Sequence, residues 1–107
     1  MNNNKDLSST GLTQEIVTQL QKIFNQYPAV KQVKIYGSRV KGTYKHNSDI
    51  DLVLYGKGLN TFLVADILCA IEDSAIPYLV DIQIYDKIVN RQLQDHIDRL
   101  GVLVYDQ

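Results

Sequence analysis

Apolar residues recur every three or four positions in three stretches of the chain, which is the spacing of an amphipathic helix. The first stretch runs from Leu12 to Tyr27, where Thr13 is a residue type that caps helices and Pro28 ends the segment. The second begins at Asn60 and stops before Pro77, and the third is ended by Gly101. The predicted helices cover residues 12–27, 60–76 and 89–100, and a single further helical turn is expected at 38–41.

Apolar and polar residues alternate in three other segments, as they do in strands with one buried face. The predicted strands are residues 32–36, 49–55 and 78–85, and each has a mostly aliphatic face and a mixed face. The helix between the second and third strands suits a parallel crossover, while the shorter first connection allows an antiparallel pair. The apolar residues 102–105 should form an extended tail packed on the domain.

These elements predict an α/β (α+β) fold with a small three-stranded sheet and about four helices. A sheet buried on both faces would have continuous aliphatic strands, and these strands alternate instead. Helices should therefore cover the aliphatic face and leave the mixed face open. The length of 107 residues suffices for one domain, which we expect over residues 12–107, preceded by a flexible N-terminal segment, residues 1–11.

The composition indicates the cellular location of the protein. No apolar run approaches the roughly 20 residues of a membrane-spanning helix, and the N-terminus lacks the apolar stretch of a signal peptide. Cys69 is the single cysteine, so an internal disulfide is excluded and a reducing, cytoplasmic location is expected. Its neighbours are apolar, and we expect Cys69 to be a small core residue. His96, on the last predicted helix, is expected at the surface.

The net charge of −1 argues against strong nucleic-acid binding through phosphate neutralisation. The distribution of charge is more informative, because no acidic residue occurs between Glu15 and Asp49. That interval holds Lys22, Lys31, Lys34, Arg39, Lys41 and Lys45. A positive region beside an acidic pair could attract an anion together with its metal ion.

The acidic pair is Asp49 and Asp51, which point to the same face of the second predicted strand. They are separated by about 6.5–7 Å along the strand, so their side chains can converge on one hard cation. Mg²⁺ is the natural candidate, because it uses one or two carboxylates and takes other ligands from water and phosphates. Asp81, on the mixed face of the third strand, would add a third carboxylate, and such a set could hold two ions.

A glycine turn precedes the acids and is suited to phosphate. Gly37 lets a backbone approach an anion closely, and Ser38 adds a hydroxyl at the start of a short turn. Arg39 and Lys41 could offset the charge of the β- and γ-phosphates. The site therefore predicts transfer at phosphorus to a hydroxyl acceptor, whose proton Asp81 would take.

In this order and spacing the residues resemble the signature of the DNA polymerase β-like nucleotidyltransferase superfamily, and the most similar branch is the minimal nucleotidyltransferases. The resemblance extends over residues 13–107. The residues that carry it are Gly37-Ser38-Arg39, Gly42, Ser48-Asp49-Ile50-Asp51-Leu52 and Val80-Asp81-Ile82.

The resemblance implies a mixed three-stranded sheet with flanking helices and a Mg²⁺ site at Asp49 and Asp51. It further implies that Asp81 is the third catalytic carboxylate and that Gly37 and Ser38 contact the triphosphate. The implied reaction transfers a nucleoside monophosphate, most often AMP from ATP, to a hydroxyl with release of pyrophosphate. Minimal members commonly work with a helical HEPN-type partner, often as the antitoxin of a toxin–antitoxin pair.

Other interpretations stay open at this point. The protein could be a non-catalytic, nucleotide-binding antitoxin or interaction module that neutralises its partner by binding. It could also transfer to a small molecule such as an aminoglycoside, or to an RNA end. The sequence leaves open the acceptor, the base of the nucleotide, the number of nucleotides added and whether the protein is a homo-oligomer.

Overall fold

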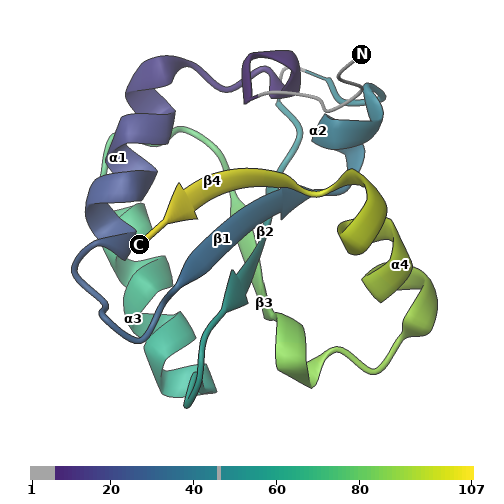
Figure 1. Ribbon diagram of the computed structural model, residues 1–107. Helices are drawn as coiled ribbons and strands as arrows, with labels where there is room; N and C mark the ends of the chain where they lie inside the picture. Colours follow the sequence, from purple (N-terminus) through teal and green to yellow (C-terminus); the bar gives the residue numbers. More distant parts are fainter. Residues whose placement is uncertain (1–6, 46) are drawn as a thin grey trace.

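A four-stranded sheet in the order β3-β2-β1-β4 forms the centre of the computed structural model, which describes residues 7–45 and 47–107 (Figure 1). The strands are β1 (Gln32–Tyr36), β2 (Ile50–Tyr55), β3 (Val80–Ile84) and β4 (Val102–Asp106). β1 is antiparallel to both β2 and β4, while β2 and β3 are parallel. The mixed α/β architecture and the predicted strand directions are confirmed.

The expected number of strands is corrected from three to four. The residues predicted to form an apolar tail are β4, which pairs with β1 from Gln32–Asp106 to Ile35–Val102. Without β4, the outer side of β1 would present a row of unpaired backbone N–H and C=O groups. The last helix returns the chain to that edge, and β4 satisfies those groups.

The predicted helices are present, and their side-chain caps explain where they begin. They are α1 (Gln14–Phe24), α2 (Ser38–Lys41), α3 (Thr61–Glu72) and α4 (Arg91–Leu100). The side chains of Thr13, Asn60 and Asn90 each accept a hydrogen bond from a backbone N–H in the first turn of α1, α3 and α4. Two short 3-10 helices, η1 (Leu7–Thr10) and η2 (Tyr85–Lys87), complete the described elements.

The N-terminal segment expected to be flexible, residues 1–11, is described only in part. Residues 1–6 lie outside the described residues. From Leu7 to Thr10 the chain forms η1, and Thr10 is buried. The folded part of the chain therefore includes residues on the N-terminal side of residue 12.

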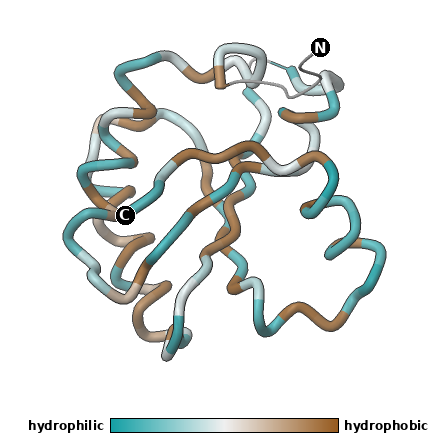
Figure 2. Tube along the Cα trace, viewed as in Figure 1, coloured by the Kyte–Doolittle hydropathy of each residue, from teal (hydrophilic) through white to brown (hydrophobic). Residues whose placement is uncertain are grey.

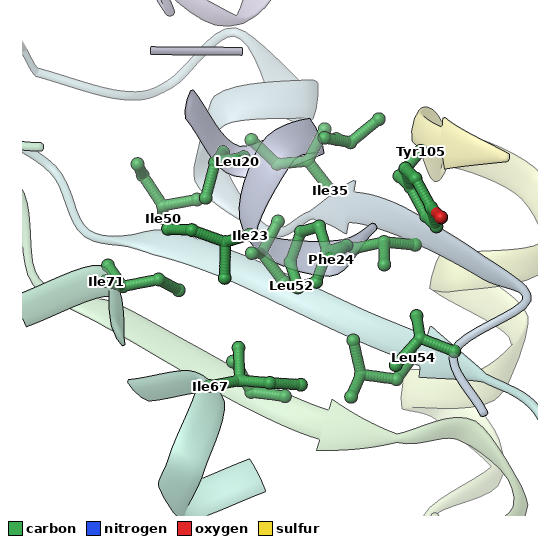
Figure 3. Close-up of a cluster of buried hydrophobic side chains, with 14 of the residues drawn as sticks. Leu20, Ile23, Phe24, Ile35, Ile50, Leu52, Leu54, Ile67, Ile71 and Tyr105 are labelled. Carbon is green, nitrogen blue, oxygen red and sulfur yellow. The ribbon is translucent and has the colours of Figure 1, made fainter. Parts of the chain in front are cut away.

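Helices α1 and α3 cover the aliphatic face of the sheet and form the main core with it (Figure 3). Leu20 and Phe24 of α1 and Ile67 of α3 meet Leu52 and Leu54 of β2, and all five side chains are fully buried. Burying an aliphatic or aromatic side chain of this size contributes about 1.5–3 kcal/mol. This layer holds the strands in register and leaves the opposite face for the polar side chains.

The opposite face was predicted to be open, and the structure corrects this. Helix α4 and the segment after β3 cover its centre, where Tyr36, Val53, Ile88 and Ile97 form a second buried cluster. The physical reason is Val53, an aliphatic residue in the middle of the mixed face, which needs an apolar cover. Helix α4 is mainly hydrophilic (Figure 2) and supplies that cover through a narrow apolar side. The end of this face that carries the acids stays uncovered.

Cys69 is exposed on α3, so the expectation of a core cysteine is wrong. Its apolar neighbours lie on other sides of the helix, because successive residues of a helix point in different directions. In the described part of the chain, no helix is long and apolar enough to cross a membrane.

Candidate active site

Two of the predicted acids face each other across adjacent strands. Asp51 of β2 lies opposite Asp81 of β3 in the parallel pair and opposite Tyr36 of β1 in the antiparallel pair. Neighbouring strands are about 4.8 Å apart, so the two carboxylates belong to one side-chain row. Asp49 precedes β2 directly and is exposed, as is Asp81, whereas Asp51 is half-buried. The structure thus brings all three acids to the uncovered end of the mixed face.

The charges of these acids act on one another. Burial raises the pKa of Asp51 above its ordinary value, and the carboxylates of Asp81 and Asp49 raise it further. Burial also raises the pKa of the Tyr36 phenol, and Asp51 and Asp81 add to the effect. Like charges gathered in this way repel one another, and a bound cation would relieve the repulsion.

The donor set suits a hard cation with few protein ligands. Within residues 7–45 and 47–107, no three His, Cys, Asp or Glu side chains are arranged so that together they could hold a metal ion. The predicted three-carboxylate metal set, Asp49, Asp51 and Asp81, is therefore not aligned as one ligand group. Mg²⁺ needs only one or two carboxylates, because water and substrate phosphates complete its octahedral shell. The carboxylates present fit that requirement.

Gly37 connects β1 to the short helix α2 and lies against Asp51. Its φ of +82° falls in the region that favours glycine. A Cβ at this position would collide with the carboxylate oxygen Oδ2 of Asp51. The N–H of Gly37 donates to Nε2 of His96, with a nitrogen-to-nitrogen distance of 2.9 Å. The glycine therefore allows close packing between the turn and the acidic row.

Ser38 and Lys41 lie on the same turn as Gly37. Ser38 begins α2 and is half-buried, while Lys41 ends α2 and is exposed. Gly42 follows in a left-handed conformation, with φ of +79°, and its N–H donates to the carbonyl oxygen of Ser38. These predicted phosphate-binding residues, together with Gly37, form one continuous turn beside the acids.

Arg39 is the remaining residue that was predicted to bind phosphate. Its side chain points into the protein, so this prediction is wrong. Its side chain is only 1% exposed. Nη1 donates to the carbonyl oxygen of Thr10 and Nη2 to that of Ser48, both at 2.8 Å. The guanidinium carbon lies 5.2 Å from the ring centroid of Tyr44 and 4.6 Å from that of Tyr78. Two carbonyls and two ring faces compensate the buried cation, which ties the loop before Asp49 to η1.

His96 was expected at the surface, but in the structure it lies against the glycine turn. It is half-buried, and its ring meets the Tyr36 ring edge-on with centroids 6.0 Å apart. A signal was present in the sequence, because His96 lies three residues after Leu93 and four before Leu100. That spacing puts it beside the apolar side of the helix. The sequence did not indicate which part of the protein packs against that side of the helix.

The site therefore consists of acids side by side on β2 and β3, next to a glycine turn that leaves β1. A family model described as "Polymerase beta, Nucleotidyltransferase" matches residues 18–107, so the chain belongs to this family and is a nucleotidyltransferase. No curated protein sequence matches the chain well enough to count as a relative.

Solved structures with the same fold include two toxin–antitoxin structures. A crystal structure of a toxin–antitoxin with AMP-PNP has a TM-score of 0.70 at 19% identity, covering 85% of this chain and 73% of that chain. The toxin–antitoxin MntA-HepT has a TM-score of 0.67 at 16% identity, covering 89% of this chain and 74% of that chain. A candidate minimal nucleotidyltransferase has a TM-score of 0.63 at 19% identity, covering 94% of this chain and 97% of that chain.

Proposed function

We propose that the protein is a Mg²⁺-dependent transferase that moves AMP from ATP to a hydroxyl of a helical, HEPN-type partner protein. In this proposal it is the antitoxin of a cytoplasmic toxin–antitoxin pair, and the transfer neutralises the partner. The observation that carries the proposal is the position of Asp51, which lies opposite Asp81 and against the backbone of Gly37. The family membership and the similar folds in toxin–antitoxin structures support the choice of reaction and partner.

The proposed roles follow from the positions of the side chains. Asp49 and Asp51 would hold Mg²⁺, which supplies Lewis-acid stabilisation of phosphate charge when it is bound. The turn from Gly37 to Lys41 would bind the triphosphate, with Ser38 as a hydrogen-bonding group and Lys41 as a neutralising charge. Asp81 is exposed beside Asp51, so it can reach an acceptor hydroxyl that approaches from solvent.

The bond changes balance in this scheme. The acceptor oxygen forms a bond to the α-phosphorus of ATP, and the bond from that phosphorus to the bridging oxygen of the β-phosphate breaks. Pyrophosphate leaves with the electron pair, and the hydroxyl proton goes to Asp81. Arg39 contributes by holding the Ser48 carbonyl, and with it the approach to Asp49, and makes no proposed phosphate contact.

The test uses ATP labelled on the α-phosphate, Mg²⁺ and the candidate partner. Label should move to the partner, whereas ATP labelled on the γ-phosphate should transfer none. Asp51→Asn should abolish the transfer. Asp66→Asn is the matched control, because it makes the same chemical change at an exposed position on α3.

Three outcomes would contradict the proposal. Transfer that persists in Asp51→Asn, or that survives removal of divalent ions, would remove the mechanism. Neutralisation of the partner by Asp51→Asn without any transfer would favour the non-catalytic antitoxin instead. Labelling of an aminoglycoside or an RNA end in place of the protein would leave the chemistry and change the acceptor.

A further inference from the structure

Helix α4 makes a side-chain contact with the glycine turn that the proposed mechanism does not use. His96 accepts the N–H of Gly37 at its Nε2 atom, at 2.9 Å. The imidazole is held in place, because the next residue, Ile97, is fully buried in the second apolar cluster. The Tyr36 ring contacts the imidazole edge-on from β1. A packed helix therefore holds an acceptor against the backbone of the turn.

The acceptor on His96 is important because the residue that donates to it is a glycine. A glycine peptide can rotate into several conformations of similar energy, because no Cβ restricts it. At Gly37, which has a φ of +82°, sterics alone do not select the observed orientation. A hydrogen bond from the N–H to a fixed acceptor does select it. The same orientation allows Gly37 to pack against Asp51.

The bond also requires one protonation state of the imidazole. Nε2 must carry a lone pair, so His96 must be neutral with its proton on Nδ1. The charged groups around it are Lys41 of α2 and Arg99 of α4, and Arg99 also pairs with Asp95 at 3.2 Å. Burial lowers the pKa of His96 below its ordinary value, and the two cations lower it further. The neutral form that the bond needs is therefore favoured at neutral pH.

We propose that His96 is a positioning residue of the nucleotide site, whose neutral imidazole fixes the Gly37 peptide and thereby holds the Gly37–Ser38 turn ready for a triphosphate. The inference rests on the proposed function, because it assumes that this turn binds the phosphates. His96 acts through Gly37 and makes no contact with the reacting atoms. Since the turn would contact phosphates and no base, the effect should be the same for ATP and GTP.

The experiment compares two substitutions at His96. His96→Gln keeps an acceptor oxygen as many bonds from Cα as Nε2 is, and His96→Leu removes the acceptor while keeping an apolar body. Affinity for ATP with Mg²⁺ is measured by calorimetry. His96→Leu should bind about five- to tenfold more weakly, the effect of one lost hydrogen bond, and His96→Gln should stay within about twofold of wild type. Gln92→Leu, an exposed change one turn earlier on α4, is the control.

The pH profile separates positioning from a merely structural role. As pH falls through the pKa of His96, the imidazole gains a proton on Nε2 and loses the bond to Gly37. Wild-type affinity for ATP should therefore fall more steeply in that range than the affinity of His96→Gln, which keeps only the loss that comes from Asp51, whose pKa is also raised. The Gly37 amide resonance, observed by NMR without nucleotide, should titrate with the same pKa.

The outcomes distinguish this inference from the proposed function. Wild-type protein that binds no ATP with Mg²⁺ overturns the proposed function and this inference with it. Wild-type binding that is unchanged or stronger in His96→Leu overturns only the role of His96. If His96→Leu does not fold, equal pH profiles of wild type and His96→Gln, or a Gly37 amide that ignores His96, overturn it equally.

Discussion

Arg39 Nη2 donates a hydrogen bond to the carbonyl oxygen of Ser48, the residue directly before Asp49. The same guanidinium donates to Thr10, so one buried side chain joins the N-terminal 3-10 helix to the loop that enters β2. A cation that is 1% exposed must be compensated by acceptors, and the two carbonyls are those acceptors. Arg39 therefore supports the acidic site from inside the protein, although the sequence had predicted that it would bind phosphate at the surface of that site.

Arg39→Met should lower the free energy of unfolding by about 2–4 kcal/mol, because two buried carbonyls lose their donors and two ring contacts are lost. Arg39→Lys should rescue little of this, since one ammonium group cannot reproduce the two-pronged guanidinium. Urea unfolding measures both. Arg99→Met is the control, because the Arg99–Asp95 pair is exposed and such pairs contribute little. Equal stability of Arg39→Met and wild type would show that the buried contacts are unimportant.

Gly37→Ala should abolish transfer, because a Cβ there collides with Asp51 and the φ of +82° suits only glycine. The backbone strain should cost about 1–3 kcal/mol of stability. Gly58→Ala is the matched control, since its φ of +73° imposes similar strain and no atom lies within 4 Å of its Cβ. Thermal unfolding and the labelled-ATP assay should then separate the two changes: both destabilise, and only Gly37→Ala loses transfer. Loss of activity in both would point to strain alone.

Asp51→Asn should raise the melting temperature of the metal-free protein at neutral pH while lowering transfer by at least about a hundredfold. The pKa of Asp51 is raised in the folded protein, so its ionised form opposes folding. The stability that the protonated form provides is present below the ordinary pKa of an aspartate and is lost as pH rises through the folded pKa. Melting curves of mutant and wild type should therefore converge at acid pH and separate at neutral pH.

The same substitution should change the response to metal. Added Mg²⁺ should raise the melting temperature of the wild type, because it relieves repulsion among the carboxylates. Asp51→Asn should respond much less, and Asp66→Asn should behave as wild type. A wild type and an Asp51→Asn variant with identical melting temperatures across pH and Mg²⁺ would contradict the electrostatic account.

Ile97→Ala should cost about 2–5 kcal/mol of stability, because the side chain is fully buried between α4 and the sheet. It should also weaken nucleotide binding, since α4 carries His96 to the glycine turn. Val89→Ala, at a position 93% exposed, should change stability by less than about 0.5 kcal/mol. Chemical denaturation and calorimetry provide the two measurements. An Ile97→Ala protein of normal stability would mean that the second cluster does not secure α4.

Helices and strands with local signals can be predicted correctly from the amino-acid sequence. The caps Thr13 and Asn60 and the apolar spacing behind them mark helices, because a helix satisfies its own backbone and needs one apolar side. The alternation around Val33 and Ile35, and around Leu52 and Leu54, marks strands for the same local reason. The two-residue period of a strand predicts that Asp49 and Asp51 share a face, and in the structure β2 begins directly after Asp49, at Ile50.

Contacts between distant segments depend on the folded structure and could not be predicted from local signals. β4 pairs with β1 across most of the chain length, and strand pairing leaves no local mark in so short a segment. Arg39 and Lys41 occupy one helical turn, and nothing nearby in the sequence tells which of them turns inward; the carbonyls of Thr10 and Ser48 decide it. His96 is placed at Gly37 because α4 packs on Val53, a contact between distant segments. Long-range packing selects among side-chain directions that local periodicity leaves equal in energy.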